Sequence, residues 1–89
     1  MDYKDYATIF KALSDPNRLR ILTIIHKEGR VCVCRILEQF DITQPTFSYH
    51  MKILQDAGLV ACEKEGTLCH YELNYDKISQ LKIFLSHLN

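Results

Sequence analysis

Residues 43–54 read Thr-Gln-Pro-Thr-Phe-Ser-Tyr-His-Met-Lys-Ile-Leu, and this stretch decides the fold. Phe47, Met51 and Leu54 recur at the spacing of one helix face, which predicts an apolar stripe packed on a core. The other face carries hydrogen-bonding side chains and no carboxylate: Gln44, Thr46, Ser48, Tyr49, His50 and Lys52. A helix face without acids suits a polyanion, so we interpret the stretch as a recognition helix for DNA. An ordinary amphipathic surface helix is the alternative.

The composition indicates a small globular protein. Its 89 residues are enough for one domain with a single core, and 47% are hydrophobic against 25% charged. No apolar run approaches the roughly 20 residues of a membrane span, and the charged start of the chain lacks a signal region. We therefore expect a cytoplasmic protein. Because the formal net charge is zero, DNA affinity must come from a local basic surface.

Helices precede the recognition helix on the chain. Apolar spacing predicts one helix over residues 5–13 and a second that starts at Asp15-Pro16 and stops at Gly29. Residues 30–34 begin β-like, and the pattern then turns helical as far as Phe40. A three-residue turn leads into the recognition helix, which covers about residues 44–57. Two short helices joined in this way form a helix-turn-helix.

A β-hairpin follows the recognition helix. Residues 60–73 alternate apolar and polar side chains around Glu65-Gly66, which predicts a wing. A loop centred between these two residues pairs Cys62 opposite Cys69 on the apolar face. The expected fold class is therefore mainly α with a small β-hairpin, a winged helix-turn-helix that spans residues 1–89 as one domain.

The last predicted helix, over residues 75–88, carries an apolar stripe that a chain of this size has little core to cover. We expect it to pack on the first helix and on the same helices of a second subunit, because unpaired apolar stripes are typical of symmetric dimers. The predicted dimer interface consists of Tyr6, Phe10, Ile78, Leu81, Phe84, Leu85 and Leu88.

The cysteines carry the second chemical signal. In a reducing compartment the pair Cys32 and Cys34 offers two thiolates, which suit soft ions such as trivalent arsenic, antimony, cadmium or lead. Residues two apart in a helix point about 200° from each other, so we hypothesise that ligation distorts this turn and re-aims the recognition helix. Alternatively, the two cysteines are small buried hydrophobes. Cys62 and Cys69 could bind an ion, oxidise together or pack the wing base.

Several motifs together resemble the ArsR-type winged-helix repressors. Residues 13–22, Leu-Ser-Asp-Pro-Asn-Arg-Leu-Arg-Ile-Leu, look like that family's second-helix signature. Cys32-Val33-Cys34 resembles the Cys-Val-Cys box of its arsenic- and cadmium-sensing members. Residues 44–51, with Leu54 and 57–60, are similar to its recognition helix and the start of its wing, and Glu65-Gly66 and Tyr71 fit the wing itself.

The resemblance implies a homodimeric repressor that binds an inverted-repeat operator through its recognition helices, with Lys52 and the wing's Lys64 on phosphates. It also implies release of the DNA when a soft ion binds Cys32 and Cys34, with arsenite or antimonite first and cadmium, lead or zinc as alternatives. Three departures bear on this expectation. Leu37 stands where arsenic sensors often have a third cysteine. The wing lacks the arginines of many relatives, and Asp76 and His87 match a terminal-helix zinc site poorly.

Three other interpretations stay open. The first is a winged-helix regulator that is switched by thiol oxidation. The second is a thiol-dependent enzyme or metal carrier, but the sequence offers no nucleotide loop or base–nucleophile pair, so we expect no catalytic residue and no organic cofactor. The third is a winged helix that binds another protein, which fits the neutral net charge.

Overall fold

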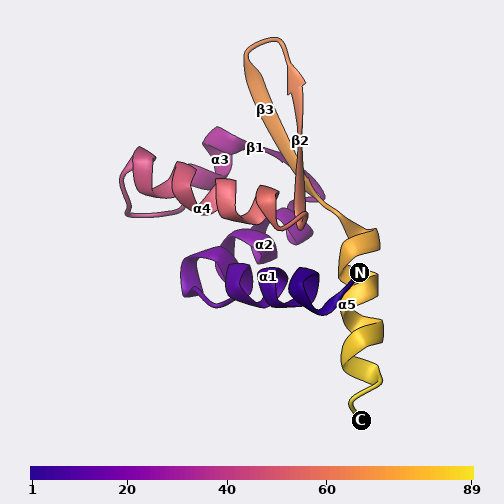
Figure 1. The fold of residues 1–89 in the computed structure, drawn as a ribbon. Coiled ribbons are helices and arrows are strands. Elements are labelled where there is room, and N and C mark those ends of the chain that lie inside the picture. Colours follow the sequence, from indigo (N-terminus) through magenta and orange to yellow (C-terminus); the bar gives the residue numbers. More distant parts are fainter.

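The computed structural model describes residues 1–89 and arranges five helices and three strands in the predicted order (Figure 1). The elements are α1 (Tyr3–Leu13), α2 (Pro16–Glu28), β1 (Arg30–Cys32), α3 (Val33–Leu37), α4 (Gln44–Asp56), β2 (Val60–Glu65), β3 (Leu68–Leu73) and α5 (Tyr75–Ser86). This winged helix-turn-helix confirms the predicted fold class. None of its helices combines the length and apolar character needed to cross a bilayer.

Local capping explains where the helices begin. The Asp15 carboxylate accepts the backbone N–H groups of Asn17 and Arg18 at 2.8 and 3.2 Å, so α2 starts at Pro16 as predicted. Thr43 Oγ1 accepts the Thr46 N–H at 3.3 Å and caps α4 in the same way. The helix before α4 is shorter than predicted: α3 ends at Leu37, not near Phe40.

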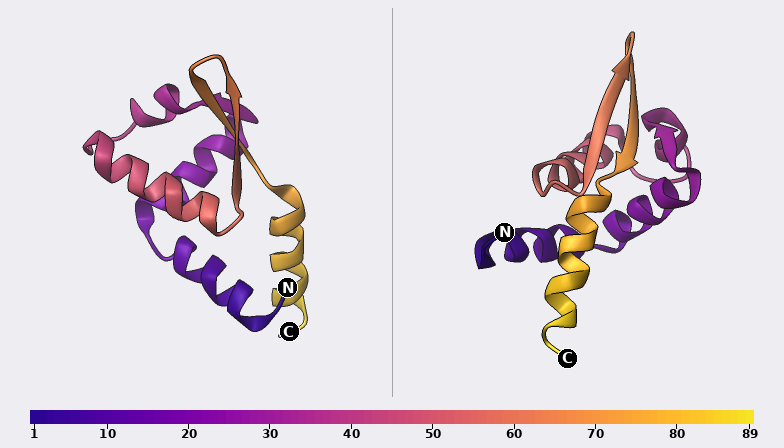
Figure 2. Two further views of the ribbon diagram at one scale, coloured as in Figure 1. Left: turned by 45° about the horizontal axis from the view of Figure 1, so that its top comes forward. Right: turned by 90° about the vertical axis from the view of Figure 1, so that its right-hand side faces the viewer.

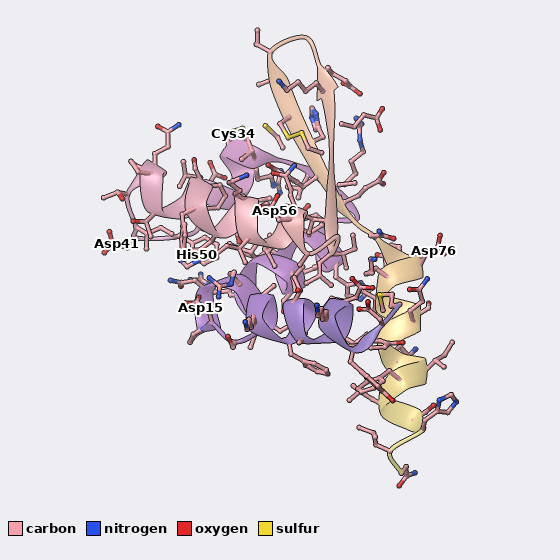
Figure 3. The ribbon with its side chains drawn as sticks, viewed as in Figure 1. Asp15, Cys34, Asp41, His50, Asp56 and Asp76 are labelled. Atoms are coloured by element: carbon pink, nitrogen blue, oxygen red, sulfur yellow. A yellow bond between two sulfur atoms is a disulfide. The ribbon has the colours of Figure 1, made fainter.

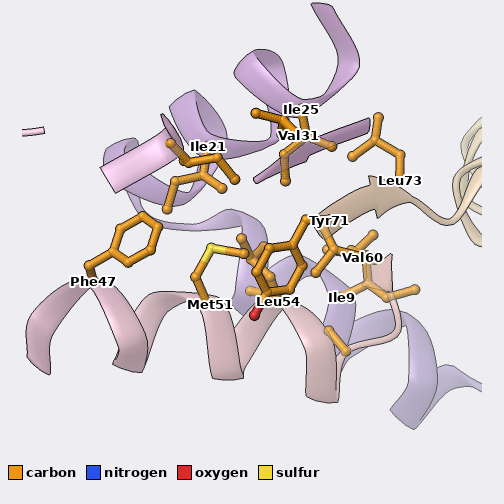
Figure 4. Packing of buried hydrophobic residues seen from close by; sticks show 14 residues of the cluster. Ile9, Ile21, Ile25, Val31, Phe47, Met51, Leu54, Val60, Tyr71 and Leu73 are labelled. Atoms are coloured by element: carbon orange, nitrogen blue, oxygen red, sulfur yellow. The ribbon is translucent and has the colours of Figure 1, made fainter. Parts of the chain in front are cut away.

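The predicted apolar stripe of α4 forms one wall of the core (Figure 4). Phe47, Met51 and Leu54 are buried there. They pack in one cluster with buried side chains of α2 and of the sheet, including Ile21 and Tyr71. Helix α4 is therefore held by its inner face, and most of its polar face remains in solvent.

The three strands form an antiparallel sheet in the order β1-β3-β2. Glu65 pairs with Leu68, so the loop is Gly66-Thr67 and Cys62 faces Tyr71. The predicted pairing of Cys62 with Cys69 is wrong. Its physical reason is Gly66, which has φ 62° and therefore belongs inside the two-residue loop.

Cys62 and Cys69 are diagonal neighbours on the core-side face of the hairpin, with Cα atoms 5.8 Å apart, and their sulfurs form a disulfide. Of the three alternatives for Cys62 and Cys69, the structure contains the oxidised one.

Helix α5 leaves the end of the hairpin and projects beyond the rest of the molecule, past the N-terminal part of α1 (Figures 1 and 2). It buries no residue fully. Its closest aromatic contact is made by its residue Phe84, whose ring stacks on the ring of Tyr6 of α1 with centroids 4.1 Å apart. The two terminal helices therefore share one partly covered apolar surface.

Candidate DNA interface and effector site

The polar face of α4 is exposed at most of the predicted positions. Gln44, Thr46, Ser48, Tyr49 and Lys52 all lie on the surface, and Tyr49 exposes 61% of its area. Thr46 is also engaged locally, since its hydroxyl accepts a hydrogen bond from Thr43 Oγ1 at 3.0 Å. The face offers hydroxyl, amide and phenol groups at the end of a helix, where backbone N–H groups attract phosphate.

His50 does not belong to this face, and its predicted DNA contact is wrong. The side chain is only 6% exposed and lies on the side of α4 that faces the start of α2, near Asp15 (Figure 3). Arg18 Nη1 lies 3.0 Å from His50 Nδ1. Arginine can only donate, so this imidazole nitrogen accepts. His50 therefore links α4 to Arg18 of α2 and lies away from the exposed face of α4.

Arg18 is the residue that sequence reasoning missed. Its Nε donates to the Ala12 carbonyl at 2.7 Å and its Nη2 to the Lys11 carbonyl at 3.3 Å, so one buried guanidinium joins the end of α1, α2 and α4. Its spacing to Ile21 and Ile25, three and seven positions later, places it on the buried face of α2. That spacing is the signal that could have found it.

The two predicted phosphate contacts are both exposed lysines. Lys52 Nζ lies 3.4 Å from the Asp56 carboxylate, but both groups are solvated and such a pair contributes little, so the ammonium can turn to phosphate. Lys64 lies on β2 among acidic neighbours. Arg30 Nη2 approaches Glu65 at 2.9 Å and Glu63 at 3.7 Å, and its hydrogen bond lowers the pKa of Glu65. This guanidinium offsets part of the wing's negative charge.

The sulfurs of Cys32 and Cys34 lie 2.7 Å apart. Cys32 is the last residue of β1 and the N-cap of α3, with φ −63° and ψ 139°, so it is not helical. The premise that the two side chains must diverge is therefore wrong, and no helix needs to unwind before both sulfurs reach one ion. Cys34 is exposed, which contradicts the buried-hydrophobe alternative for that residue.

The two thiols share one hydrogen bond, in which either sulfur can be the donor. The hydrogen bond with the Cys34 side chain, followed by backbone N–H donors, lowers the pKa of Cys32. The same sulfur contact raises the pKa of Cys34. One thiolate is therefore favoured beside a solvent-accessible thiol, and this donor set fits a soft cation.

Comparisons with known proteins identify the family of the chain. A profile described as a helix-turn-helix domain matches residues 13–63. An arsenical resistance operon repressor from Staphylococcus xylosus is 43% identical over all of this chain and 85% of its own length. The chain belongs to the ArsR family. A cadmium resistance regulatory protein homologue from Staphylococcus aureus is 37% identical over 91% of this chain and 69% of its own.

Solved ArsR structures share the fold. The crystal structure of an ArsR family transcriptional regulator superposes with a TM-score of 0.89 at 24% identity, covering 99% of this chain and 90% of that one. A homodimeric winged helix-turn-helix DNA-binding domain from Mycobacterium bovis superposes with a TM-score of 0.77 at 26% identity, covering 96% and 78%. The ArsR family consists of DNA-binding transcriptional regulators rather than enzymes, and the present chain is one of them.

The structure also shows where the residues lie that depart from the ArsR pattern. Leu37 packs partly buried against the core, so its position supplies no ligand. Asp76 lies in the first turn of α5 and His87 at its C-cap, so they lie at opposite ends of the helix. Nowhere do three histidine, cysteine or carboxylate side chains already converge as a metal site.

The predicted dimer residues fall into three groups, and the first is the pair Tyr6 and Phe84, whose rings stack on each other. Ile78 and Leu81 pack partly against the chain's own core. Phe10, Leu85 and Leu88 expose 39%, 47% and 71% of their area, and Ile83, which the prediction omitted, exposes 56%. Helices α1 and α5 and the residues after α5 thus expose several large apolar side chains, as protein interfaces do.

Proposed function

We propose that the protein is a homodimeric transcriptional repressor that binds an inverted-repeat operator and releases it when Cys32 and Cys34 bind a soft metal or metalloid. The observation that carries the proposal is the 2.7 Å approach of two free thiol sulfurs at the start of α3, immediately before the recognition helix. Relatives named as arsenical resistance repressors favour arsenite as the effector, while the cadmium regulator homologue keeps cadmium, lead and zinc as alternatives.

The proposed DNA contacts are the exposed groups of α4. Gln44, Ser48 and Tyr49 are suited to base edges and phosphates in the major groove, which admits one helix. Thr46 stays near the backbone at the helix start, and Lys52 and Lys64 are suited to phosphates. Two such helices, one per subunit, would lie about one DNA turn apart.

The proposed dimer forms through α1 and α5. The apolar side chains Phe10, Ile83, Leu85 and Leu88 support this, because each leaves a large part of its area exposed to solvent. The homodimeric relative from Mycobacterium bovis, which shares the fold over most of the chain, also supports it. Dimerisation doubles the basic contacts that a protein of zero net charge can offer to DNA.

Coupling between the thiols and DNA requires a difference in ion affinity between the two states. Allosteric coupling is typically about 1–3 kcal/mol, which corresponds to a change of about 5–150-fold in DNA affinity. Cys32 and Cys34 lie at the junction of β1 and α3, and residues 38–43 connect α3 to α4. Ligation that shifts this junction would change how the wing and α4 fit the groove together.

The test is a titration of fluorescent DNA from the gene's own promoter with the reduced protein, alone and with arsenite, Cd²⁺ or peroxide. We expect tight binding without additions and release by arsenite at micromolar concentration. A random duplex of the same length is the control. Absence of specific DNA binding in every state would overturn the proposal, and release by peroxide alone would refute the metal-binding part of it.

A second candidate function is a winged-helix regulator that is switched by thiol oxidation. One observation supports it, the disulfide between Cys62 and Cys69 within the wing. In this case two thiols give two electrons and two protons to a peroxide, which is reduced to water, and the cross-linked hairpin alters DNA affinity. A Cys62→Ser, Cys69→Ser variant separates the two functions. Loss of peroxide sensitivity with arsenite sensitivity retained would assign oxidation to the wing.

A further inference from the structure

The outer face of the sheet brings a histidine beside the thiol pair. Cys32 of β1 pairs directly with His70 of β3, and His70 pairs with Glu63 of β2. Side chains of paired residues share a face, so these three form one row across the sheet. Val31, Tyr71 and Cys62 occupy the neighbouring row on the core side.

His70 has a polar atom that nothing in the structure satisfies. Its Nδ1 is buried and has no hydrogen-bond partner. The nearby guanidinium of Arg30 cannot supply the missing bond, because it is engaged with the carboxylates of Glu63 and Glu65 on β2. A buried nitrogen without a partner costs free energy, and it calls for a ligand or another explanation.

We propose that His70 supplies the third ligand of the effector site. This proposal rests on the proposed binding of a metal by Cys32 and Cys34, and it answers the question that Leu37 leaves open. The sulfurs already lie together, α3 contacts β3, and His70 is the cross-strand neighbour of Cys32. Since no three donors converge yet, the imidazole must turn toward the sulfurs when an ion binds.

A ligand set of two thiolates and one imidazole selects among ions. It is the donor combination of tetrahedral zinc sites, and it suits zinc-like divalent cations such as Cd²⁺. The softest ions gain less from a nitrogen ligand than from sulfur. His70 therefore extends the response of the site to divalent cations, and it joins the start of α3 to a strand of the wing through the bound ion.

The test measures Cd²⁺ affinity from the ultraviolet thiolate-to-metal absorption of the reduced full chain. We expect His70→Gln to weaken Cd²⁺ binding by about tenfold or more, with little change in arsenite binding. His26→Gln is the matched control, since His26 lies on α2 with a single 3.4 Å contact to Tyr75. His70→Cys replaces the nitrogen by a third sulfur and should restore Cd²⁺ binding, which a purely structural role would not predict.

Equal Cd²⁺ affinity in His70→Gln and the unsubstituted chain would overturn the proposal, and so would failure of His70→Cys to restore binding when His70→Gln loses it. The promoter assay keeps this outcome separate from the proposed function. If Cd²⁺ releases DNA from His70→Gln at unchanged concentration, the repressor function stands and the role of His70 fails. If Cd²⁺ binds in a His70-dependent way but never releases DNA, the ligand assignment stands and the repressor switch fails.

Discussion

Replacement of Arg18 by alanine tests how the recognition helix is held. The substitution removes the donors to two buried acceptors, the Ala12 carbonyl at 2.7 Å and His50 Nδ1 at 3.0 Å. A buried acceptor left without a partner costs about 1–3 kcal/mol, so the free energy of unfolding should fall by about 2–6 kcal/mol. The weaker hydrogen bond to the Lys11 carbonyl, at 3.3 Å, adds little.

Urea unfolding followed by circular dichroism measures this decrease. Arg20→Ala is the matched control on the same helix, because Arg20 is exposed and gives up one hydrogen bond to the Gln39 carbonyl and its stacking over the Phe40 ring. It should cost about 1 kcal/mol. Since whole domains are stable by only about 5–15 kcal/mol, Arg18→Lys provides a milder variant if Arg18→Ala does not fold. Equal decreases for Arg18→Ala and Arg20→Ala would refute the reasoning.

Three further variants test separate parts of the structure. Burial opposes ionisation of Asp15, but the N–H groups of Arg18 and Asn17 hold its pKa below the ordinary 3.8. The Asp15 cap therefore stabilises the fold above that pH, and this contribution is lost as the pH falls. Asp15→Ala should lower the free energy of unfolding by about 1 kcal/mol at pH 7, and its acid unfolding curve should converge with that of the parent. Lys52→Ala should lower the salt dependence of operator binding by about one unit of slope for each phosphate that the lysine neutralises, without changing sequence preference. Leu85→Glu should give a monomer by light scattering, whereas Lys82→Glu on the same helix should not.

The starts of α2 and α4 were predictable because local capping sets them. The capping groups act through their immediate neighbours, as Asp15, Pro16 and Thr43 do. The buried face of α4 was predictable from the spacing of Phe47, Met51 and Leu54. The hairpin register was not predictable from alternation, because a shift of one residue in the loop changes every pair. It depended on which residue takes positive φ, and this is Gly66 in the first loop position.

The candidate site was predicted by residue type but not by geometry. The exposed face of α4 followed from its spacing, yet His50 is buried because Arg18, 32 positions earlier, satisfies its ring nitrogen. The convergence of Cys32 and Cys34 depended on Cys32 ending a strand rather than lying in a helix. The pairing of Cys32 with His70 required the full sheet order, in which the first strand joins a hairpin formed much later in the chain.

The most direct test of the central claim is an arsenite titration of the operator complex followed by fluorescence anisotropy. Cys32→Ser, Cys34→Ser should bind DNA as tightly as the parent and remain bound throughout the titration. The matched control is Cys62→Ser, Cys69→Ser, which leaves the proposed effector thiols intact and should release DNA as the parent does. Release of DNA by arsenite from the Cys32→Ser, Cys34→Ser protein would contradict the account.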